Sequence, residues 1–167
     1  ERVRENKKLK KQGLSFKRIM SFGLSYYWIG KFVKGEILFE EAKKELAEAR
    51  RLSPRKQAIL FELGSFYLSQ KKYDEALALF REAYELAPTF SEARKIYALG
   101  AIYDSKLPLA ADLLSAGSND DPVFLLDERL VQAYGSIKQP NALVALWQGA
   151  LAAHPEFKQP VSDFLAD

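Results

Sequence analysis

The chain has 167 residues, of which 48% are hydrophobic and 28% charged, a composition typical of a folded protein and not of a disordered one. It contains no cysteine, which excludes disulfides and thiolate metal sites and leaves the compartment open. The net charge of +3 combines +6 over residues 1–20 with −3 over the remainder, so a strongly basic start precedes a mildly acidic body.

Residues 1–15 are predicted to form a basic leader. Its run ERVRENKKLKKQ fits a solvated, partly helical segment, a juxtamembrane segment on anionic lipid, or a nucleic-acid contact. The run lacks interleaved aromatic residues, so the solvated interpretation is favoured and nucleic acid ranks last. No uncharged apolar run reaches the roughly 18 residues of a membrane span, and no secretory signal is present. Because the chain begins at Glu1 and not at Met, we expect a fragment of a longer protein or a trimmed chain.

Two helices are predicted in the next part of the chain, over about residues 16–34 and 38–51. The first is apolar around most of its circumference, so it needs cover on more than one side. Gly35 ends it. In the second, Leu38, Ala42, Leu46 and Ala49 recur at helical spacing, and the charged residues between them form a solvent face.

Residues 57–88, QAILFELGSFYLSQKKYDEALALFREAYELAP, predict two helices joined by a short polar turn. Small residues at Gly64, Ala76 and Ala83 allow the two helices to approach closely. Large apolar residues fill the space around them, namely Leu60, Leu63, Tyr67 and Phe80. Pro88 ends the second helix. One such hairpin cannot bury both of its faces, so neighbours are expected on each side.

This order and spacing resembles the tetratricopeptide repeat (TPR) family, because eight positions of the family pattern are filled within one repeat length of about 34 residues. A shift back by one repeat length places Ile29, Gly30, Val33, Ala42, Leu46, Ala49 and Pro54 on the same pattern. Further on, the Leu99-Gly100 and Tyr103 positions repeat it again, with Pro108 near the start of a second helix that Gly117-Ser118-Asn119 ends.

A fourth pair is predicted over about residues 122–155, with Asp121-Pro122 as the start of its first helix. Leu130 and Tyr134 belong to the first helix, and Leu143, Trp147, Ala150 and Pro155 to the second. Val131 stands where the family has Gly, so packing there should be looser or rotated. The segment 156–167 is predicted to be a short amphipathic cap.

The resemblance implies an all-α, right-handed superhelical solenoid with a repeat domain over residues 16–155. Its repeats are expected at about 23–56, 57–90, 91–121 and 122–155, followed by the capping segment 156–167. The family binds protein partners, so we expect a scaffold that holds a peptide or a partner helix in the concave groove lined by the first helices.

Carried onto this sequence, the groove residues would be Tyr27, Lys31, Phe61, Ser65, Leu68, Arg94 and Tyr97, with Leu24, Ala58, Ala101, Leu125, Glu128 and Gln132 at equivalent positions. These aromatic and aliphatic side chains suit an apolar helix or an extended peptide. The alternative is that Tyr27, Phe61 and Tyr97 only pack between repeats. No Asn occupies these positions, so the carboxylate-gripping set of the best-known subfamily is missing.

No pattern predicts catalysis, and we expect neither an enzyme nor a cofactor or metal. His154, the one histidine, precedes Pro155 at a helix end, where a cationic side chain interacts with terminal carbonyls. Asp120-Asp121 has no third carboxylate at ligand spacing, and Asp121 is better explained as a helix cap. Phosphate-binding loops, nucleophile elbows and paired histidine ligands are absent from the sequence.

A narrower resemblance links LSPRKQAILFELGSFYL and ARKIYALGAIYDSKLPLAADLL to the soluble TPR tails of bacterial O-antigen ligase or polymerase-like membrane proteins. It implies an alternative function, the accessory domain of a surface-polysaccharide protein, with the leader close to a membrane. The sequence favours a cytoplasmic location or the soluble part of a membrane protein. Partner identity and oligomeric state stay open.

Overall fold

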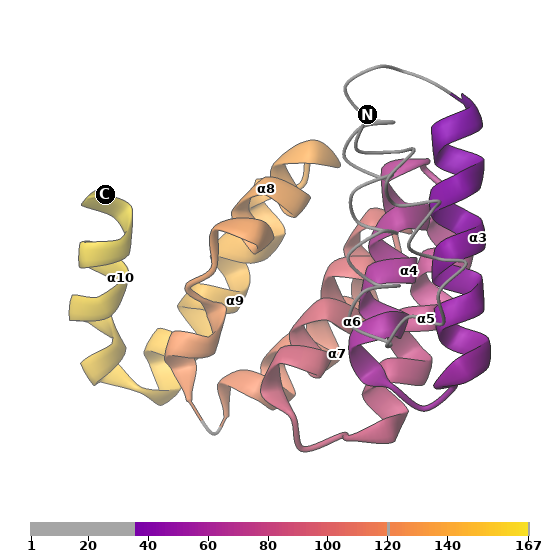
Figure 1. The fold of residues 1–167 in the computed structure, drawn as a ribbon. Coiled ribbons are helices and arrows are strands. Elements are labelled where there is room, and N and C mark those ends of the chain that lie inside the picture. The colour runs from indigo at the N-terminus through magenta and orange to yellow at the C-terminus, as the bar shows by residue number, and fades with distance from the viewer. Residues whose placement is uncertain (1–35, 120, 167) are drawn as a thin grey trace. The chain divides into compact units, whose positions relative to one another are not determined.

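The computed structural model describes residues 36–119 and 121–166, with side chains from Glu40 onward. In these ranges every regular element is helical, eight α-helices and two short 3₁₀ helices (Figure 1), which confirms the all-α prediction. None of the described helices is long and apolar enough to cross a bilayer. The predicted basic leader and the predicted helix over residues 16–34 lie outside the described residues.

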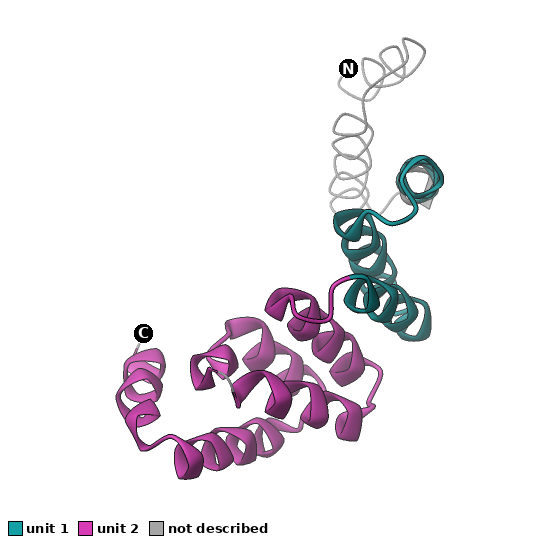
Figure 2. Ribbon diagram, turned by 90° about the horizontal axis from the view of Figure 1, so that it is seen from below, with its two compact units in different colours: residues 1–86 teal, residues 87–167 magenta. Residues whose placement is uncertain are grey.

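The chain divides into two compact units, residues 1–86 and 87–167, which Figure 2 shows in different colours. The first unit contains α3 (Glu36–Leu52), α4 (Gln57–Ser69) and α5 (Tyr73–Leu86). Their apolar faces share one core, to which each helix contributes: Ala42, Leu46, Leu60, Leu63, Phe66, Leu79 and Ala83. Of the apolar positions predicted on this helix, Ala42 and Leu46 lie in this core and Ala49 is also fully buried, so the helical spacing from Ala42 onward marks a core face.

Close approach of α4 and α5 depends on Gly64. The Phe80 ring from α5 lies directly against this buried glycine, and a Cβ built at Gly64 would overlap the ring. Phe80 itself is only 2% exposed. The small residue and the aromatic residue that the sequence places on facing helices thus interlock, as predicted for this hairpin.

The second unit begins with the hairpin of α6 (Ser91–Tyr103) and α7 (Leu107–Ser118). A 3₁₀ helix, η1 (Pro122–Leu125), leads to a second hairpin of α8 (Glu128–Ser136) and α9 (Pro140–Ala153). A further 3₁₀ helix, η2 (Pro155–Phe157), precedes α10 (Lys158–Ala166). The end of α7 at Ser118 confirms the predicted stop at Gly117-Ser118-Asn119.

All three described hairpins turn in the same way. Lys71, Ser105 and Lys138 each adopt a left-handed backbone, with φ of 60°, 58° and 58°. The next residue in each turn donates its N–H to a carbonyl in the last turn of the first helix, over 3.0, 2.8 and 2.9 Å. This is the arrangement that glycine usually occupies after a helix, here built with residues for which it is less favourable.

The prediction that the first helix of the fourth pair starts at Pro122 is wrong. Pro122 opens a four-residue 3₁₀ helix, and the α-helix begins only at Glu128. Two caps explain the break, because the Asp121 carboxylate accepts from the N–H of Val123 and the Asp127 carboxylate accepts from the N–H of Arg129. With two N-caps six residues apart, the chain forms two short helices in place of one.

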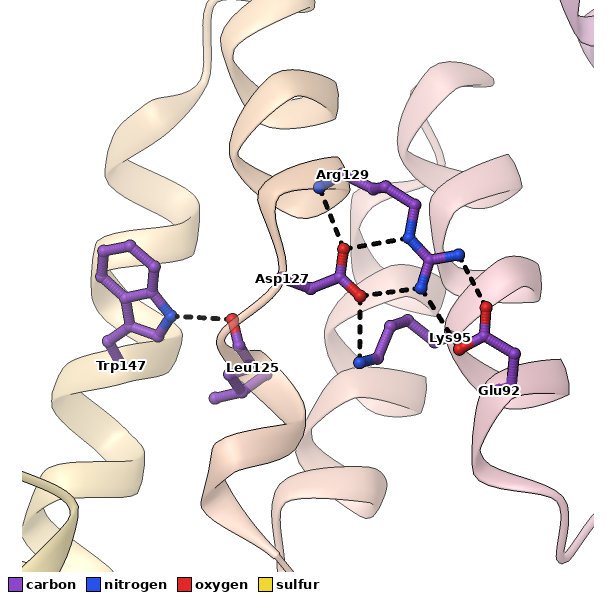
Figure 3. A network of polar contacts seen from close by, with 6 residues as sticks. All are labelled: Glu92, Lys95, Leu125, Asp127, Arg129 and Trp147. Atoms are coloured by element: carbon purple, nitrogen blue, oxygen red, sulfur yellow. Dashed lines mark hydrogen bonds and ion pairs between the residues drawn. The ribbon is translucent and has the colours of Figure 1, made fainter. Parts of the chain in front are cut away.

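Trp147 on α9 holds the last elements of the second unit together. Its indole Nε1 donates to the carbonyl oxygen of Leu125 at 3.2 Å in a buried position (Figure 3). On α10, Phe164 meets the same indole edge-on, with the ring centroids 6.1 Å apart. α10 has no buried residue of its own among those described, and Leu165 is 65% exposed, so this helix is held by few contacts.

Candidate partner-binding surfaces

Three of the predicted groove residues, Phe61, Ser65 and Leu68, lie on α4 at spacings that place them along one side of the helix. Ser65 is exposed, and Phe61 and Leu68 are half-buried on either side of it. Phe61 also packs against the shared core of the first unit. This side of α4 therefore offers a polar centre between two partly accessible apolar side chains. We call it the α4 face.

The remaining predicted positions do not form one described surface. Leu24, Tyr27 and Lys31 lie outside the described residues. Ala101 and Leu125 are fully buried, so the expectation that they face a groove is wrong. For Leu125 the reason is the 3₁₀ helix, which turns this side chain into the core instead of continuing the register of α8. Ala58, Glu128 and Gln132 are exposed.

Arg94 and Tyr97 lie on α6 in the second unit, and both are half-buried. The Arg94 guanidinium donates to the carbonyl oxygens of Pro88 and Ala116 at 3.3 and 3.5 Å. These long contacts anchor the side chain to the backbone. Arg94 also lines a hollow of about 610 Å³, together with Lys95, Asp121, Phe124 and others. Arg94 therefore fastens the start of α6 to the end of α7.

A polar network joins α6 to the start of α8 (Figure 3). Arg129 binds Asp127 through Nε and Nη2 at 3.0 and 2.7 Å, and binds Glu92 through Nη1 and Nη2 at 2.6 and 3.2 Å. Lys95 adds an ion pair to Asp127 at 3.1 Å and lies 4.7 Å from the centre of the Phe124 ring. The side chains of Lys95 and Asp127 are each only 13% exposed. Asp127 is the shared acceptor of the network.

The pKa of Asp127 reflects this position. Burial alone would raise the pKa, but the hydrogen bonds from Arg129 and Lys95 outweigh it and hold the pKa of this carboxyl well below its usual value. The same contacts with Asp127 and Glu92 raise the pKa of Arg129. Both groups are therefore charged at neutral pH.

In the first unit the ion pair between neighbouring helices lies elsewhere, on α3 and α5. Arg50 Nη2 donates to Glu82 Oε2 at 2.6 Å, with both side chains about 40% exposed. The pair borders a hollow of about 310 Å³, the α3–α5 hollow, whose lining residues are Arg50, Leu63, Tyr67, Glu75, Ala78, Leu79 and Glu82. Three of its seven lining residues, Arg50, Glu75 and Glu82, are therefore charged, and the others are apolar or aromatic.

The second unit has a counterpart between α7 and α9, the α7–α9 hollow, of about 190 Å³. A shift of two repeat lengths, to within one residue, relates the lining residues of the two hollows. It takes Ala78, Leu79 and Glu82 to Ala145, Leu146 and Gly149, and it takes Arg50 to Ser118. All four of these counterparts line the hollow, together with Ser115, Asn119, Ala150, Ala153 and His154. No Asp, Glu, Lys or Arg is among the lining residues.

Residues 38–89 match the family model described as tetratricopeptide repeat. This segment therefore has the sequence pattern of a tetratricopeptide repeat. It spans most of α3, all of α4 and α5, and the Pro88 position, so the TPR pattern expected from Leu63-Gly64, Tyr67 and Phe80 is confirmed for this part of the chain.

The TPR segment and its surroundings also resemble known proteins. Over 90 residues the chain is 32% identical to cell division cycle protein 27 homolog A of Arabidopsis thaliana, a match that covers 51% of this chain and only 12% of the plant protein. The crystal structure of MamA aligns with 94% of this chain and 89% of its own, at a TM-score of 0.64 and 18% identity.

YrrB, whose crystal structure is described as that of a TPR protein with an unusual peptide-binding site, aligns over 84% of this chain and 73% of its own. The TM-score is 0.51 and the identity 18%. At such low identity these structures establish the fold alone. The fold class is that of TPR solenoid proteins.

A Pro-x-Phe tripeptide recurs along the chain and was not among the predicted features. Pro88-Thr89-Phe90, Pro122-Val123-Phe124 and Pro155-Glu156-Phe157 recur at intervals of one repeat length, to within one residue. The first precedes α6, the second lies in η1 and the third forms η2. Phe124 and Phe157 are 7% and 1% exposed, and the Phe124 ring lies against Gly117 so closely that a Cβ there would overlap it. The first copy differs, because Phe90 is 45% exposed and no 3₁₀ helix forms there.

Proposed function

We propose that this protein is a non-catalytic interaction scaffold whose α4 face binds a peptide or a helix of a partner protein. The observation that carries the proposal is the combination on α4 of exposed Ser65 with half-buried Phe61 and Leu68. A partner can bury the accessible parts of both apolar side chains without first unfolding anything, and rigid aromatic side chains make good anchors. The TPR assignment of residues 38–89 supports this use of the helix.

Within the described residues no group of three or more His, Cys, Asp or Glu could hold a metal ion. We infer that affinity for a partner comes from the burial of apolar side chains. Partner contacts would be apolar at Phe61 and Leu68, with hydrogen bonding at the Ser65 hydroxyl.

Ser65→Arg tests the proposal, because it places a long charged side chain at the exposed centre of the α4 face. Ala47→Arg, on an exposed position of α3, is the matched control. Both variants and the parent chain are panned against the same displayed peptide library. We expect enriched peptides that bind the parent and the Ala47→Arg variant and bind the Ser65→Arg variant at least tenfold more weakly. Peptides that bind all three chains equally would refute the α4 face as the site.

An accessory role beside a membrane-embedded surface-polysaccharide protein is an alternative, motivated by the sequence resemblance of residues 52–68 and 93–114. The basic leader would then lie near anionic lipid. Flotation of the chain with vesicles of anionic lipid, compared with a chain lacking residues 1–12, tests it. Equal flotation of the two chains would argue against the leader as a membrane contact.

A further inference from the structure

Glu62 is the one charged residue of α4, whose other side chains are all uncharged. It lies beyond the first turn of the helix, so interaction with the helix dipole does not explain its place. Around the helix axis, at 3.6 residues per turn, Phe61 and Leu68 fall on one side of Ser65 and Glu62 falls on the other. The α4 face therefore has an apolar edge and an acidic edge.

The Glu62 carboxylate is half-buried and has no polar partner among the described residues, neither a hydrogen bond nor an ion pair. Burial raises its pKa, and within the described part of the chain no positive group offsets this effect. By contrast, the partly buried Lys95 and Asp127 pair with each other. Glu62 has thus lost part of its hydration without gaining a partner within the chain, which costs free energy in the unbound state.

We propose that the α4 face recognises a partner segment that carries a lysine or arginine next to its apolar residues, and that Glu62 binds this cation. The inference rests on the proposed function, because it names the chemistry of the segment that the α4 face would hold. An ammonium or guanidinium group donates a charge-assisted hydrogen bond to a carboxylate, and this bond replaces the water that burial has removed.

Both edges of the α4 face favour such a segment. Phe61 and Leu68 bury apolar side chains of the partner. A partner with an apolar or acidic residue against Glu62 would complete the desolvation of the carboxylate without compensating for it, so Glu62 also disfavours the wrong segments. The preferred segment is therefore amphipathic, with apolar residues against Phe61 and Leu68 and a basic residue against Glu62.

The test uses the peptides that the parent chain enriches from the displayed library. We expect these peptides to share a lysine or arginine at a fixed spacing from apolar residues, and Glu62→Gln to weaken their binding about tenfold. Glutamine keeps the shape of the side chain and removes only its charge, so this variant should fold. Glu75→Gln is the matched control, because it removes the same charge from an exposed position on α5 and should leave the affinity unchanged.

A second measurement separates a direct contact from a structural effect of Glu62. The shared basic residue of a selected peptide is replaced by methionine, and both peptides are titrated against the parent chain and Glu62→Gln. We expect the replacement to weaken binding to the parent about tenfold and binding to Glu62→Gln by less than about twofold, since the two residues interact. An equal loss in both chains would overturn the contact between Glu62 and the cation.

The outcomes also distinguish this inference from the proposed function. Peptides that lose affinity for Ser65→Arg but share no basic residue, or that bind Glu62→Gln as tightly as the parent, would leave the α4 face as the site and overturn the role of Glu62. Peptides that bind Ser65→Arg as tightly as the parent, or a library from which none is enriched, would overturn both proposals.

Discussion

The two units build similar hairpins and use charge in different places. In the first unit, Arg50 on α3 pairs with Glu82 on α5, and both side chains are about 40% exposed. In the second, Lys95 on α6 pairs with Asp127 at the start of α8, and both side chains are 13% exposed. The equivalents of the first pair are Ser118 and Gly149, which are uncharged. The ion pairs that connect neighbouring hairpins therefore lie on different helices in the two units. Below, the α6–α8 joint means the polar contacts of Lys95 and Arg129 with Asp127 and Glu92.

This difference has an energetic consequence. Exposed ion pairs contribute about 0–1 kcal/mol, because water and salt screen them. A partly buried, multiply hydrogen-bonded carboxylate contributes more, and the loss of one partner leaves the others unsatisfied. The second unit therefore has the stronger polar network, between α6 and the start of α8.

The largest effect is expected where the units resemble each other, at the glycine under an aromatic ring. Gly64→Val should destabilise the first unit by about 3 kcal/mol, because the new side chain overlaps the Phe80 ring in a packed interior. Gly135→Val, at an open exposed position, is the control and should cost less than about 1 kcal/mol. Urea unfolding followed by circular dichroism measures both. Similar losses in the two variants would show that the Gly64–Phe80 contact is not specially tight.

The next largest effect is expected to differ between the two units. Asp127→Ala should destabilise the α6–α8 joint by about 2 kcal/mol, because it removes the α8 N-cap and leaves Lys95 without its carboxylate. Glu82→Ala should cost about 0.5 kcal/mol, since its pair with Arg50 is well exposed. Amide hydrogen exchange in α8 and in α5 reports the two losses separately. Equal losses would contradict the contrast between the joints.

Acid should affect the same joint. The folded pKa of Asp127 lies below the ordinary value of about 3.9, so its stabilisation is complete above about pH 5 and declines as the pH falls toward the folded pKa. We expect the stability advantage of the parent chain over Asp127→Asn to shrink by about 1 kcal/mol between pH 6 and pH 3. Unfolding curves at several pH values measure it. An advantage that grows on acidification would contradict the assigned direction.

The smallest effect concerns the turns that both units share. Lys71→Gly and Ser105→Gly should each stabilise the chain by about 0.5–1 kcal/mol, because glycine adopts the observed positive φ without steric cost. Thermal unfolding detects such gains as a rise in Tm. The control is Lys72→Gly, one residue beyond the left-handed position, which gains nothing of this kind. A loss of stability at Lys71→Gly would mean that its side chain makes a contact worth more than the strain.

The sequence was most informative where local chemistry and helix packing agree. The Gly64, Phe80 and Ala83 pattern predicted the α4–α5 hairpin and its interlock, and Gly117 with Asn119 predicted the end of α7. It was misleading at Asp121-Pro122, because a strong helix start does not reveal that Asp127 caps again six residues later. The α6–α8 network was not predicted, since Glu92 and Arg129 are 37 residues apart and look like ordinary surface charges.

Candidate sites were harder to predict for a related reason. A family pattern assigns positions to a groove, but burial decides which of them a partner can reach. Ser65 is exposed whereas Ala101 and Leu125 are not, although the same pattern selected all three. At the α7–α9 hollow, Ser118 and Gly149 replace the ion pair found at the equivalent positions Arg50 and Glu82. No sequence motif marks the absence of an ion pair.

The most direct test of the contrast between the units is a pair of double-mutant cycles in the same chain. One cycle combines Lys95→Met with Asp127→Ala, and the other combines Arg50→Met with Glu82→Ala. We predict a coupling energy of about 1 kcal/mol for Lys95 with Asp127 and less than about 0.5 kcal/mol for Arg50 with Glu82. Equal coupling energies, or a larger value for Arg50 with Glu82, would contradict the claim that the polar joint of the second unit lies between α6 and α8.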